Sequence, residues 1–427
     1  MSATASSAGS EGDCAMGWIG LDDTDSLEGG CTTWDMHILL SAIESCVTNV
    51  GWRVRGAPQL VRLWPHAPRR TRGNAALAAY IEVEYDSLDE FNELLENWFE
   101  NRFGHLRGQS QRNDGQDSAP VLIHSINALP EDWYWSAVHG LVDVEERLNE
   151  LEAIEGTSIW SMTRTDGVVG ASSAIAWPAC VDWTWEAIAW RREQAIGTQR
   201  VVSEEVVEQM AALFSDTILN RDPNAGRSLI TPRTPCPVLY GIRSESQEQA
   251  ADAHAWLQNQ SLVERAVACR VHLTNQATGD HLRGVDSGVL IEQVRSGRRG
   301  HASARVRTTT GSDVLVAFAE GGPVNRLFRS AEVGDRLNWA GLPSPDGSVH
   351  LEQLQLDEVA PRELSRPLCV CGGRLRRKGR GQPLSCRLCN SIDGSHWVGN
   401  IGEVSDWVEP PPSHRRHLAR PLARRPR

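Results

Sequence analysis

Hydrophobic positions near the start of the chain change from the spacing of a strand to the spacing of a helix. The apolar run from Trp18 to Leu21 predicts a short buried strand. From Trp34 onward, apolar residues recur every three or four positions, which predicts an amphipathic helix that begins near Thr32. We expect Thr32 or Thr33 to cap this helix, because a threonine hydroxyl can accept a hydrogen bond from the first helical N–H groups.

Strand-like and helix-like segments alternate as far as residue 262, which predicts layers of α and β structure instead of a helical bundle. Residues 121–126 have the pattern of a strand, and residues 140–156 have that of an acidic amphipathic helix. Residues 167–177 are mostly small, which suits a close approach of two backbone segments. Residues 108–119 are polar and rich in turn formers, so we expect a loop or linker.

From about residue 285 the pattern changes to short alternating strands separated by polar turns. Three strands are predicted at 288–294, 301–308 and 313–319, followed by a short helix at 323–331. Two more strands follow at 335–341 and 349–359. This order is that of an OB-fold, a five-stranded barrel that often binds oligonucleotides, but a barrel without that role has the same order. Arginines around the first hairpin favour nucleic acid: Arg295, Arg298, Arg299, Arg305 and Arg307.

The ten cysteines do not have the pattern of a disulfide framework. Six are scattered singly, and four form two pairs near the end of the chain: Cys369, Cys371, Cys386 and Cys389. Two such pairs are typical of a zinc ribbon, in which four thiolates hold a structural Zn²⁺ and leave no position for water. The first pair has the spacing C-x-C, one residue shorter than usual. Basic residues at 374–380 lie between the pairs and suit a nucleic-acid backbone.

Charge is distributed unevenly. The formal net charge is −12, and Lys378 is the only lysine among 43 basic residues. An acidic surface poor in lysine suits a high-salt cytoplasm, although a GC-rich genome gives the same bias. Arginine is concentrated at 69–72, 297–307 and 415–427, where it can contact phosphates. We expect a cytoplasmic protein, because we find no run of membrane-spanning length and residues 1–14 lack the pattern of a signal peptide.

The densest group of reactive side chains lies in residues 17–33, between the predicted strand and helix. It contains three aspartates, a glycine pair and Cys-Thr-Thr. Free N–H groups at a helix N-terminus attract phosphate, whereas three carboxylates repel it unless a hard cation such as Mg²⁺ lies between them. The pattern therefore favours a metal–nucleotide site over an acidic, solvated turn.

These residues, GWIGLDDTDSLEGGCTT, resemble the N-terminal motif of archaeal tRNA-isoleucine 2-agmatinylcytidine synthetases, which reads roughly GIDDTDSxxGxCTT. Four later segments resemble segments of that family in the same order: 69–80, 181–191, 227–245 and 273–282. Together they cover most of residues 17–282. Two features depart from the family pattern: Asp166 stands where the family has Arg, and the first cysteine pair is shorter.

The resemblance implies an ATP-dependent ligase that joins agmatine to C2 of the wobble cytidine in the CAU anticodon of isoleucine tRNA, so that the tRNA reads AUA codons. The implied cofactors are ATP, Mg²⁺ and a structural Zn²⁺. The implied partners are this tRNA and agmatine, with no obligate protein partner and no membrane. One alternative is a nucleic-acid binding protein that uses the OB-fold and zinc ribbon without catalysis. Another is a different ATP-dependent enzyme with the same N-terminal module.

Roles are carried over to matching positions. The resemblance implies that catalysis and Mg²⁺–ATP binding involve Asp22, Asp23, Asp25 and Thr32. It implies further ATP contacts at Gly20, Cys31, Thr33, Arg70, Arg72 and Asn74. Because a guanidinium group needs planar carboxylate partners, we expect the agmatine pocket among Asp182, Glu186, Pro237, Tyr240, Arg243 and Glu245.

The expected fold class is α+β and multidomain. A disordered segment, 1–14, precedes a kinase-like α/β ATP-binding domain at 15–130 and a ferredoxin-like domain at 131–262. The OB-fold β-barrel then occupies 268–360, the C-terminal zinc ribbon 365–395 and a basic tail 408–427.

Overall fold

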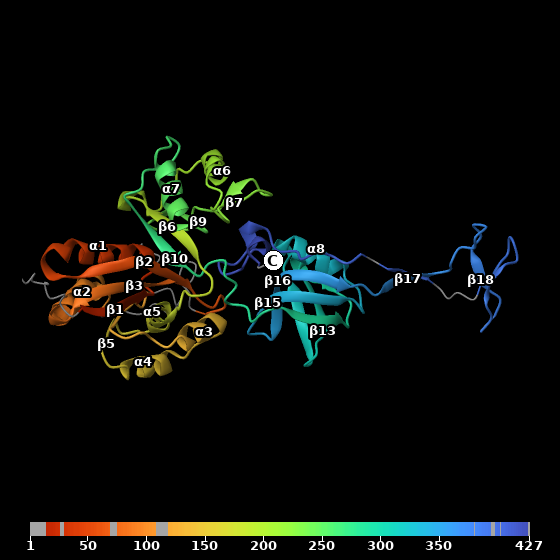
Figure 1. Cartoon of the computed structure of the whole chain (residues 1–427), viewed down its shortest axis with the longest axis horizontal. Helices are drawn as coiled ribbons and strands as arrows, with labels where there is room; N and C mark the ends of the chain where they lie inside the picture. The colour runs from red at the N-terminus through yellow and green to blue at the C-terminus, as the bar shows by residue number, and fades with distance from the viewer. Residues whose placement is uncertain are drawn as a thin grey trace, which may run out of the picture. The chain divides into compact units, whose positions relative to one another are not determined.

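The computed structural model describes residues 14–25, 30–68, 75–107, 118–379, 381–393, 398–401 and 403–425. The chain forms two compact units (Figure 1). The first extends to His281 and also contains Arg416–Arg420, and the second contains Leu282–Arg415 and the residues from Pro421 onward. Both helices and strands contribute to each unit, so the chain is a mixed α+β multidomain protein, as expected.

An eight-stranded sheet forms the centre of the first unit, in the order β5-β4-β1-β3-β2-β10-β6-β9. Every neighbouring pair is antiparallel except β2 and β10, which are parallel. The sheet therefore consists of two antiparallel halves joined at that pair. Its strands are β1 (Cys14–Asp22), β2 (Arg53–Arg62), β3 (Ala75–Glu84), β4 (Val121–Ser125), β5 (Thr157–Ser161), β6 (Thr184–Trp190), β9 (Val238–Ser244) and β10 (Ala268–Thr274).

Helices cover both faces of this sheet (Figure 1). On one face pack α1 (Thr32–Val50) and α2 (Leu88–Phe103), and on the other pack α3 (Asp132–His139), α4 (Val144–Glu152) and α5 (Gly167–Ala176). Two more helices, α6 (Glu204–Leu213) and α7 (Gln247–Gln258), pack against β6 and β9, beside the short hairpin of β7 (Arg221–Asp222) and β8 (Arg227–Ser228). Each apolar helix face thus buries its side chains against the pleated sheet.

The small residues of α5 allow this helix to approach β1 closely, as the sequence predicted. A Cβ atom at Gly170 would lie 1.7 Å from Asp22 Oδ2, and one at Gly20 would lie 2.5 Å from the carbonyl oxygen of Ala171. Neither position has room for a larger side chain. Gly20 therefore fixes the distance between the strand and the helix.

Five strands of the second unit close into a barrel: β11 (Asp286–Leu290), β13 (Ala302–Arg307), β14 (Ser312–Ala317), β15 (Arg336–Pro343) and β16 (Ser348–Glu358). Pairing of β11 with both β15 and β13 closes the ring. Helix α8 (Pro323–Ser330) buries Val324 and Phe328 in the barrel core. The predicted order of three strands, a helix and two strands is confirmed, and the two-residue β12 (Arg295–Ser296) extends the sheet beside β13.

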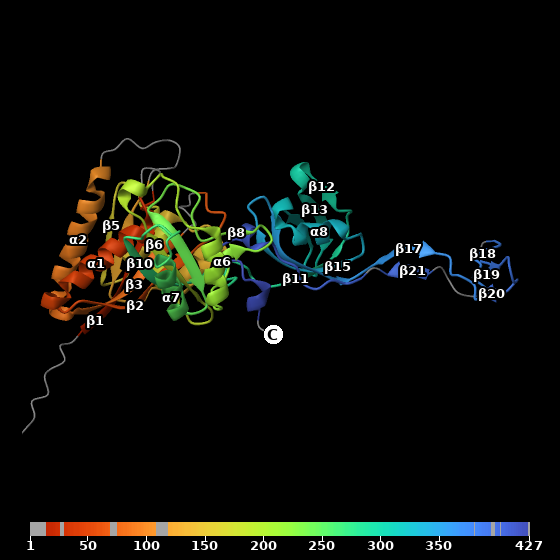
Figure 2. The same cartoon turned by 90° about the horizontal axis from the view of Figure 1, so that it is seen from above.

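Beyond the barrel lie two small sheets, labelled in Figure 2. One pairs β17 (Pro361–Ser365) with β21 (Val398–Ile401). The other consists of β18 (Leu375–Arg377), β19 (Leu384–Cys386) and β20 (Ile392–Asp393) and carries part of the cysteine cluster. In the parts of the chain that the structure describes, no helix has the length and hydropathy needed to cross a membrane.

One local prediction was wrong, and another was right with narrower bounds. Neither threonine caps α1, because Cys31 holds the N-cap position without a side-chain bond and Thr32 is already helical. Instead, Oδ1 of Asp25 accepts a hydrogen bond from the backbone N–H of Thr32 at 2.9 Å. The helix predicted at 140–156 is confined to Val144–Glu152, since α3 ends just before Gly140.

Candidate active site

A cavity of about 260 Å³ lies in the first unit, where the loop between β1 and α1 meets β6 and β9. Its wall includes residues from both halves of the sheet and one residue from the C-terminal tail. The lining consists of Asp25, Cys31, Thr32, Thr33, Arg62, Ala75, Glu186, Ile188, Leu229, Ile230, Thr231, Pro232, Thr234, Cys236, Val238, Gly241, Arg243 and His417.

Buried polar side chains hold the N-terminus of α1 at this cavity. Asp35, fully buried in the first turn of the helix, accepts from Thr24 Oγ1 at 2.5 Å and from Arg102 Nε at 2.8 Å. Burial raises the pKa of Asp35, and the charge of Arg102 together with both hydrogen bonds opposes that change. Thr24 Oγ1 also lies 3.4 Å from Thr32 Oγ1. The hydroxyl of Thr32 is thus held at the cavity wall by a fixed neighbour.

Thr33 and Cys31 form a second contact at the same helix end. Trp190 donates from Nε1 to Thr33 Oγ1 at 3.2 Å, while Cys31 Sγ lies 3.2 Å from that oxygen. The His37 ring stacks on Trp190 with a centroid separation of 4.7 Å. Burial, followed by the charge of Asp25, raises the pKa of the Cys31 thiol to about 12. Cys31 therefore stays protonated and packs against Thr33.

A carboxylate and two guanidinium groups form the opposite part of the lining. Glu186 Oε2 lies 3.5 Å from Arg62 Nη2, and Glu186 Oε1 lies 3.9 Å from Arg243 Nε. Gln276 Nε2 donates a hydrogen bond to Glu186 Oε2. Gly241 makes room for this carboxylate, because a Cβ atom there would lie 2.4 Å from Glu186 Oε1. This cluster of side chains can bind anions through Arg62 and Arg243 and a cation through Glu186.

Six of the predicted site residues line the cavity together: Asp25, Cys31, Thr32, Thr33, Glu186 and Arg243. The predicted ATP contacts Arg70, Arg72 and Asn74 lie outside the described residues. Sequence reasoning assigned no role to several other lining residues, among them Arg62, Ile188 and His417. The similarity of residues 227–245 to the family did indicate the segment that supplies Leu229 to Arg243.

The other predicted aspartates lie away from the cavity lining. Asp22 packs against Gly170 of α5. Asp23, buried with φ near 57°, accepts at its carbonyl oxygen from Ala119 N at 3.0 Å. Asp182 forms an ion pair with Arg420 at 2.7 Å. Side chains alternate along a strand, and the chain bends sharply after β1. As a result, only Asp25 of the three N-terminal aspartates faces the cavity.

Three predicted agmatine-pocket residues also have other surroundings. Tyr240 is fully buried, with its hydroxyl bonded to His254 at 2.9 Å and to Gln258 at 2.8 Å. Pro237 is buried between two lining residues, and its carbonyl oxygen accepts from Arg191 N. Glu245 is exposed just beyond β9.

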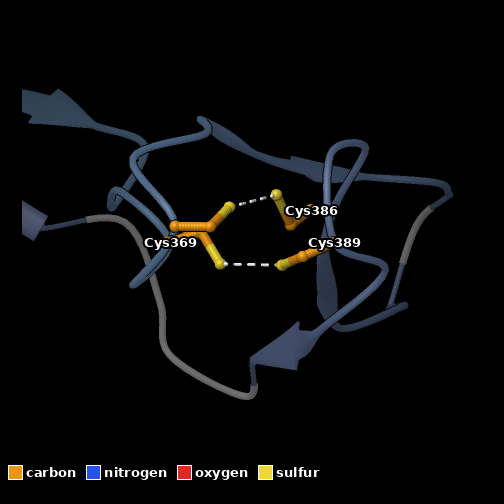
Figure 3. Close-up of side chains that lie close together, drawn as sticks. Cys369, Cys386 and Cys389 are labelled. Carbon is orange, nitrogen blue, oxygen red and sulfur yellow. Dashed lines mark hydrogen bonds between the residues drawn. The ribbon is translucent and has the colours of Figure 1, made fainter.

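The four clustered cysteines converge on one point. Their sulfur atoms all lie within 4.8 Å of one another, with Cys369 and Cys389 3.4 Å apart (Figure 3). Cys371 lies 3.5 Å from Cys386. Four thiolates about 2.3 Å from a tetrahedral zinc ion have sulfur atoms about 3.8 Å apart, so this donor set fits zinc. The short C-x-C pair still brings both sulfur atoms to the cluster.

Among the described residues, this cluster is the one group of three or more His, Cys, Asp or Glu side chains whose ligand atoms converge in this way. The three N-terminal aspartates do not form such a group. Carboxylate and hydroxyl oxygens of the kind that Mg²⁺ prefers do line the cavity, on Asp25, Glu186 and Thr32.

Comparisons with known proteins find similarity along most of the chain. The model for the TiaS TCKD domain matches residues 18–163, and that for the TiaS FLD domain matches residues 165–281. A relative from Staphylothermus marinus, named as the TiaS synthetase that forms 2-agmatinylcytidine in an isoleucine tRNA, is 31% identical over 95% of this chain and 93% of its own. A relative of the same name from Archaeoglobus fulgidus is 29% identical over 95% of this chain and 97% of its own.

Solved structures agree with the sequence comparisons. A crystal structure of TiaS in complex with an isoleucine tRNA and ATP has a TM-score of 0.80 and 27% identity, over 97% of this chain and 98% of the solved one. A second crystal structure contains TiaS with that tRNA, AMPCPP and agmatine. It has a TM-score of 0.77 and 25% identity, over 96% of this chain and 98% of the solved one.

We predict that Cys31 resists alkylation from about pH 7 to about pH 9, because its raised pKa leaves almost no reactive thiolate in that range. Iodoacetamide labelling of the native protein, followed by peptide mass spectrometry, measures this. Cys180 is exposed and serves as the internal control. Equal labelling rates for the two cysteines would contradict the assignment of Cys31 as a protonated packing residue.

Proposed function

The chain belongs to the TiaS family, the tRNA-isoleucine 2-agmatinylcytidine synthetases, and from this premise we propose the reaction that its cavity carries out. The protein is an ATP-dependent ligase that joins agmatine to C2 of the wobble cytidine in the CAU anticodon of isoleucine tRNA. The modified tRNA reads AUA codons. One observation supports this most strongly: a helix N-terminus with a threonine hydroxyl lines the same cavity as a glutamate between two arginines.

The ATP phosphates bind at the N-terminus of α1 in this proposal. The helix dipole attracts anions there, and Arg62 and Arg243 add guanidinium groups suited to phosphate oxygens. Asp25 is the aspartate that would hold Mg²⁺ together with those oxygens. When bound, Mg²⁺ offsets the negative charge of the phosphates. The Thr32 hydroxyl lies at the phosphates and is itself a candidate for phosphorylation.

Agmatine carries a guanidinium group at one end and an amine at the other, so its site needs a carboxylate within the cavity. Glu186 supplies it, because this residue lines the cavity whereas Asp182 pairs with Arg420 and Glu245 lies exposed beyond β9. Arg62 and Arg243 lie beside Glu186 and limit its movement.

The chemistry follows from the poor leaving group at C2 of cytidine. Transfer of a phosphoryl group from ATP to the C2 oxygen turns that oxygen into part of a phosphate. The agmatine amine then attacks C2, the C–O bond breaks, phosphate leaves with the electron pair and the amine loses a proton. This sequence of steps converts ATP to ADP and one phosphate, and the conversion to AMP and two phosphates that the family implies also requires water to take up the phosphoryl group from the second phosphoanhydride bond. The helix N-terminus stabilises the negative charge that builds up on the transferred group.

Binding of the tRNA is assigned to the second unit. We take the barrel as an OB-fold at 268–360 and the cysteine cluster as a zinc ribbon at 365–395, with kinase-like and ferredoxin-like domains at 15–130 and 131–262. The target base leaves its stack to reach the cavity. The cytoplasm, where tRNA is modified, is the proposed location. Exposed basic side chains that suit the RNA backbone are Arg295, Arg298, Arg299, Arg305, Arg307, Arg374, Arg376, Arg377 and Lys378.

A modification assay tests this function directly. The purified protein is incubated at high salt with ATP, Mg²⁺, agmatine and isoleucine tRNA that has a CAU anticodon, and nucleosides are analysed by mass spectrometry. We expect a cytidine that gains agmatine only when every component is present. Bound tRNA with no adduct and no ATP use would favour a binding protein instead. Consumption of ATP without the adduct would point to another acceptor.

We predict that Thr32→Val lowers the single-turnover rate of adduct formation by about a hundredfold, because it removes a hydroxyl at the phosphates and keeps the shape of the side chain. Thr32→Ser retains the hydroxyl and should stay within about tenfold of the wild type. The affinity for tRNA should be unchanged in both. Loss of tRNA binding with intact turnover in Thr32→Val would contradict the proposed division of roles.

We predict that removal of zinc weakens tRNA binding more than it lowers ATP hydrolysis, because the cysteine cluster lies in the second unit and the cavity in the first. Cys389→Ser removes one ligand, and Cys180→Ser is the matched control at an exposed cysteine outside the cluster. Fluorescence anisotropy measures tRNA affinity, and phosphate release measures hydrolysis. Equal losses in both readouts would show that the cluster supports the whole molecule.

A further inference from the structure

The segment Arg416–Arg420 belongs to the first unit, although the residues on both sides of it belong to the second. Its backbone is hydrogen-bonded to the segment after β10, since Ala277 N donates to His417 O and Gly279 N donates to Leu418 O, both at 2.8 Å. These two bonds join a turn of the C-terminal segment to the turn that follows β10. The C-terminal segment is therefore docked at a defined position beside the cavity.

Side chains on both sides of His417 fix this segment further. Leu418 is 1% exposed and packs in the apolar cluster below α5 that contains Ile175. Arg420 donates from Nε to Thr278 O at 2.6 Å and pairs through Nη2 with Asp182 Oδ2 at 2.7 Å. Apolar burial and a charge-assisted bond thus hold the segment together with its backbone bonds. The role of Asp182 is to anchor the tail.

His417 is the residue of this segment that reaches the cavity, where it connects to Glu186 through one amide. The distance from His417 Nδ1 to Gln276 Oε1 is 3.0 Å, and Gln276 Nε2 donates to Glu186 Oε2. A carboxylate only accepts hydrogen bonds, so the amide nitrogen must face Glu186 and the amide oxygen must face the histidine. His417 Nδ1 therefore carries a proton and donates it.

The surroundings keep this histidine neutral. Partial burial of the ring, followed by the charges of Arg62 and Arg243, lowers the pKa of His417 below its ordinary value, although the residue as a whole is exposed at the cavity. A neutral ring with its proton on Nδ1 leaves Nε2 as an acceptor. Among the described residues, that nitrogen makes no hydrogen bond.

We propose that the C-terminal segment Arg416–Arg420 is part of the active site and that His417 is a positioning residue, which orients Glu186 through Gln276 to receive the cationic end of agmatine. This inference rests on the proposed function. Arg62 and Arg243 compete for the Glu186 carboxylate from 3.5 Å and 3.9 Å. His417 orients the Gln276 amide, and this amide holds Glu186 Oε2 away from a closer ion pair with Arg62. The Glu186 carboxylate therefore stays available to a substrate cation.

The test compares variants of His417 that differ in which ring nitrogen they replace. An asparagine amide can donate from near the position of Nδ1, whereas a glutamine amide extends toward the position of Nε2. We expect His417→Asn to behave like the wild type, and His417→Gln and His417→Ala to raise the KM for agmatine about tenfold, with the KM for ATP unchanged. His414→Asn changes an exposed histidine of the same tail in the second unit and is the matched control.

A double-mutant cycle tests the route through the amide. If His417 acts through Gln276, the combination of His417→Ala and Gln276→Ala should raise the KM for agmatine no more than either change alone. Additive effects, an unchanged KM in His417→Ala, or equal increases for agmatine and ATP would each overturn the inference while the wild type still forms the adduct. A wild type that forms no adduct would overturn the proposed function and this inference with it.

Discussion

The parallel pairing of β2 with β10 is the constraint on which the rest of the first unit depends. It is short, yet it joins two antiparallel halves that would otherwise be separate sheets. The Asn275 side chain extends it, because its Oδ1 accepts from Arg62 N at 2.7 Å and its Nδ2 donates to Arg62 O at 2.9 Å. A buried amide thus replaces the next pair of backbone bonds and fixes the end of β2.

The pairing of β2 with β10 also determines the electrostatics of the cavity. Arg62 is the last residue of β2, and Glu186 lies on β6, the strand on the other side of β10. The halves of the sheet therefore supply the two members of one ion pair, and the N-terminus of α1 lies beside them. Burial, followed by the charge of Arg243, lowers the pKa of Arg62, and the neighbouring carboxylate of Glu186 opposes that change. The fold keeps both charges in place by contacts from each half.

Sequence patterns predicted those features that depend on neighbours in the chain. The strand and helix around the Asp-rich turn, the close backbone packing at Gly170 and the order of the barrel all follow from local periodicity and residue size. The cavity required contacts between residues far apart in sequence, such as Gln276 and His417, which no periodic pattern encodes. Asp22 and Asp25 likewise look equivalent in sequence, and only the turn between them decides which carboxylate reaches the cavity.

The position of the C-terminal segment has a consequence for synthesis of the protein. A ribosome adds residues in order, so the loop between β1 and α1 and the eight strands of the central sheet can leave the exit tunnel long before His417 is made. Until then the cavity lacks the part of its lining that His417 supplies. A chain released before residue 417 would contain every strand of the sheet and still lack a complete site, which separates the ability to fold from the ability to act.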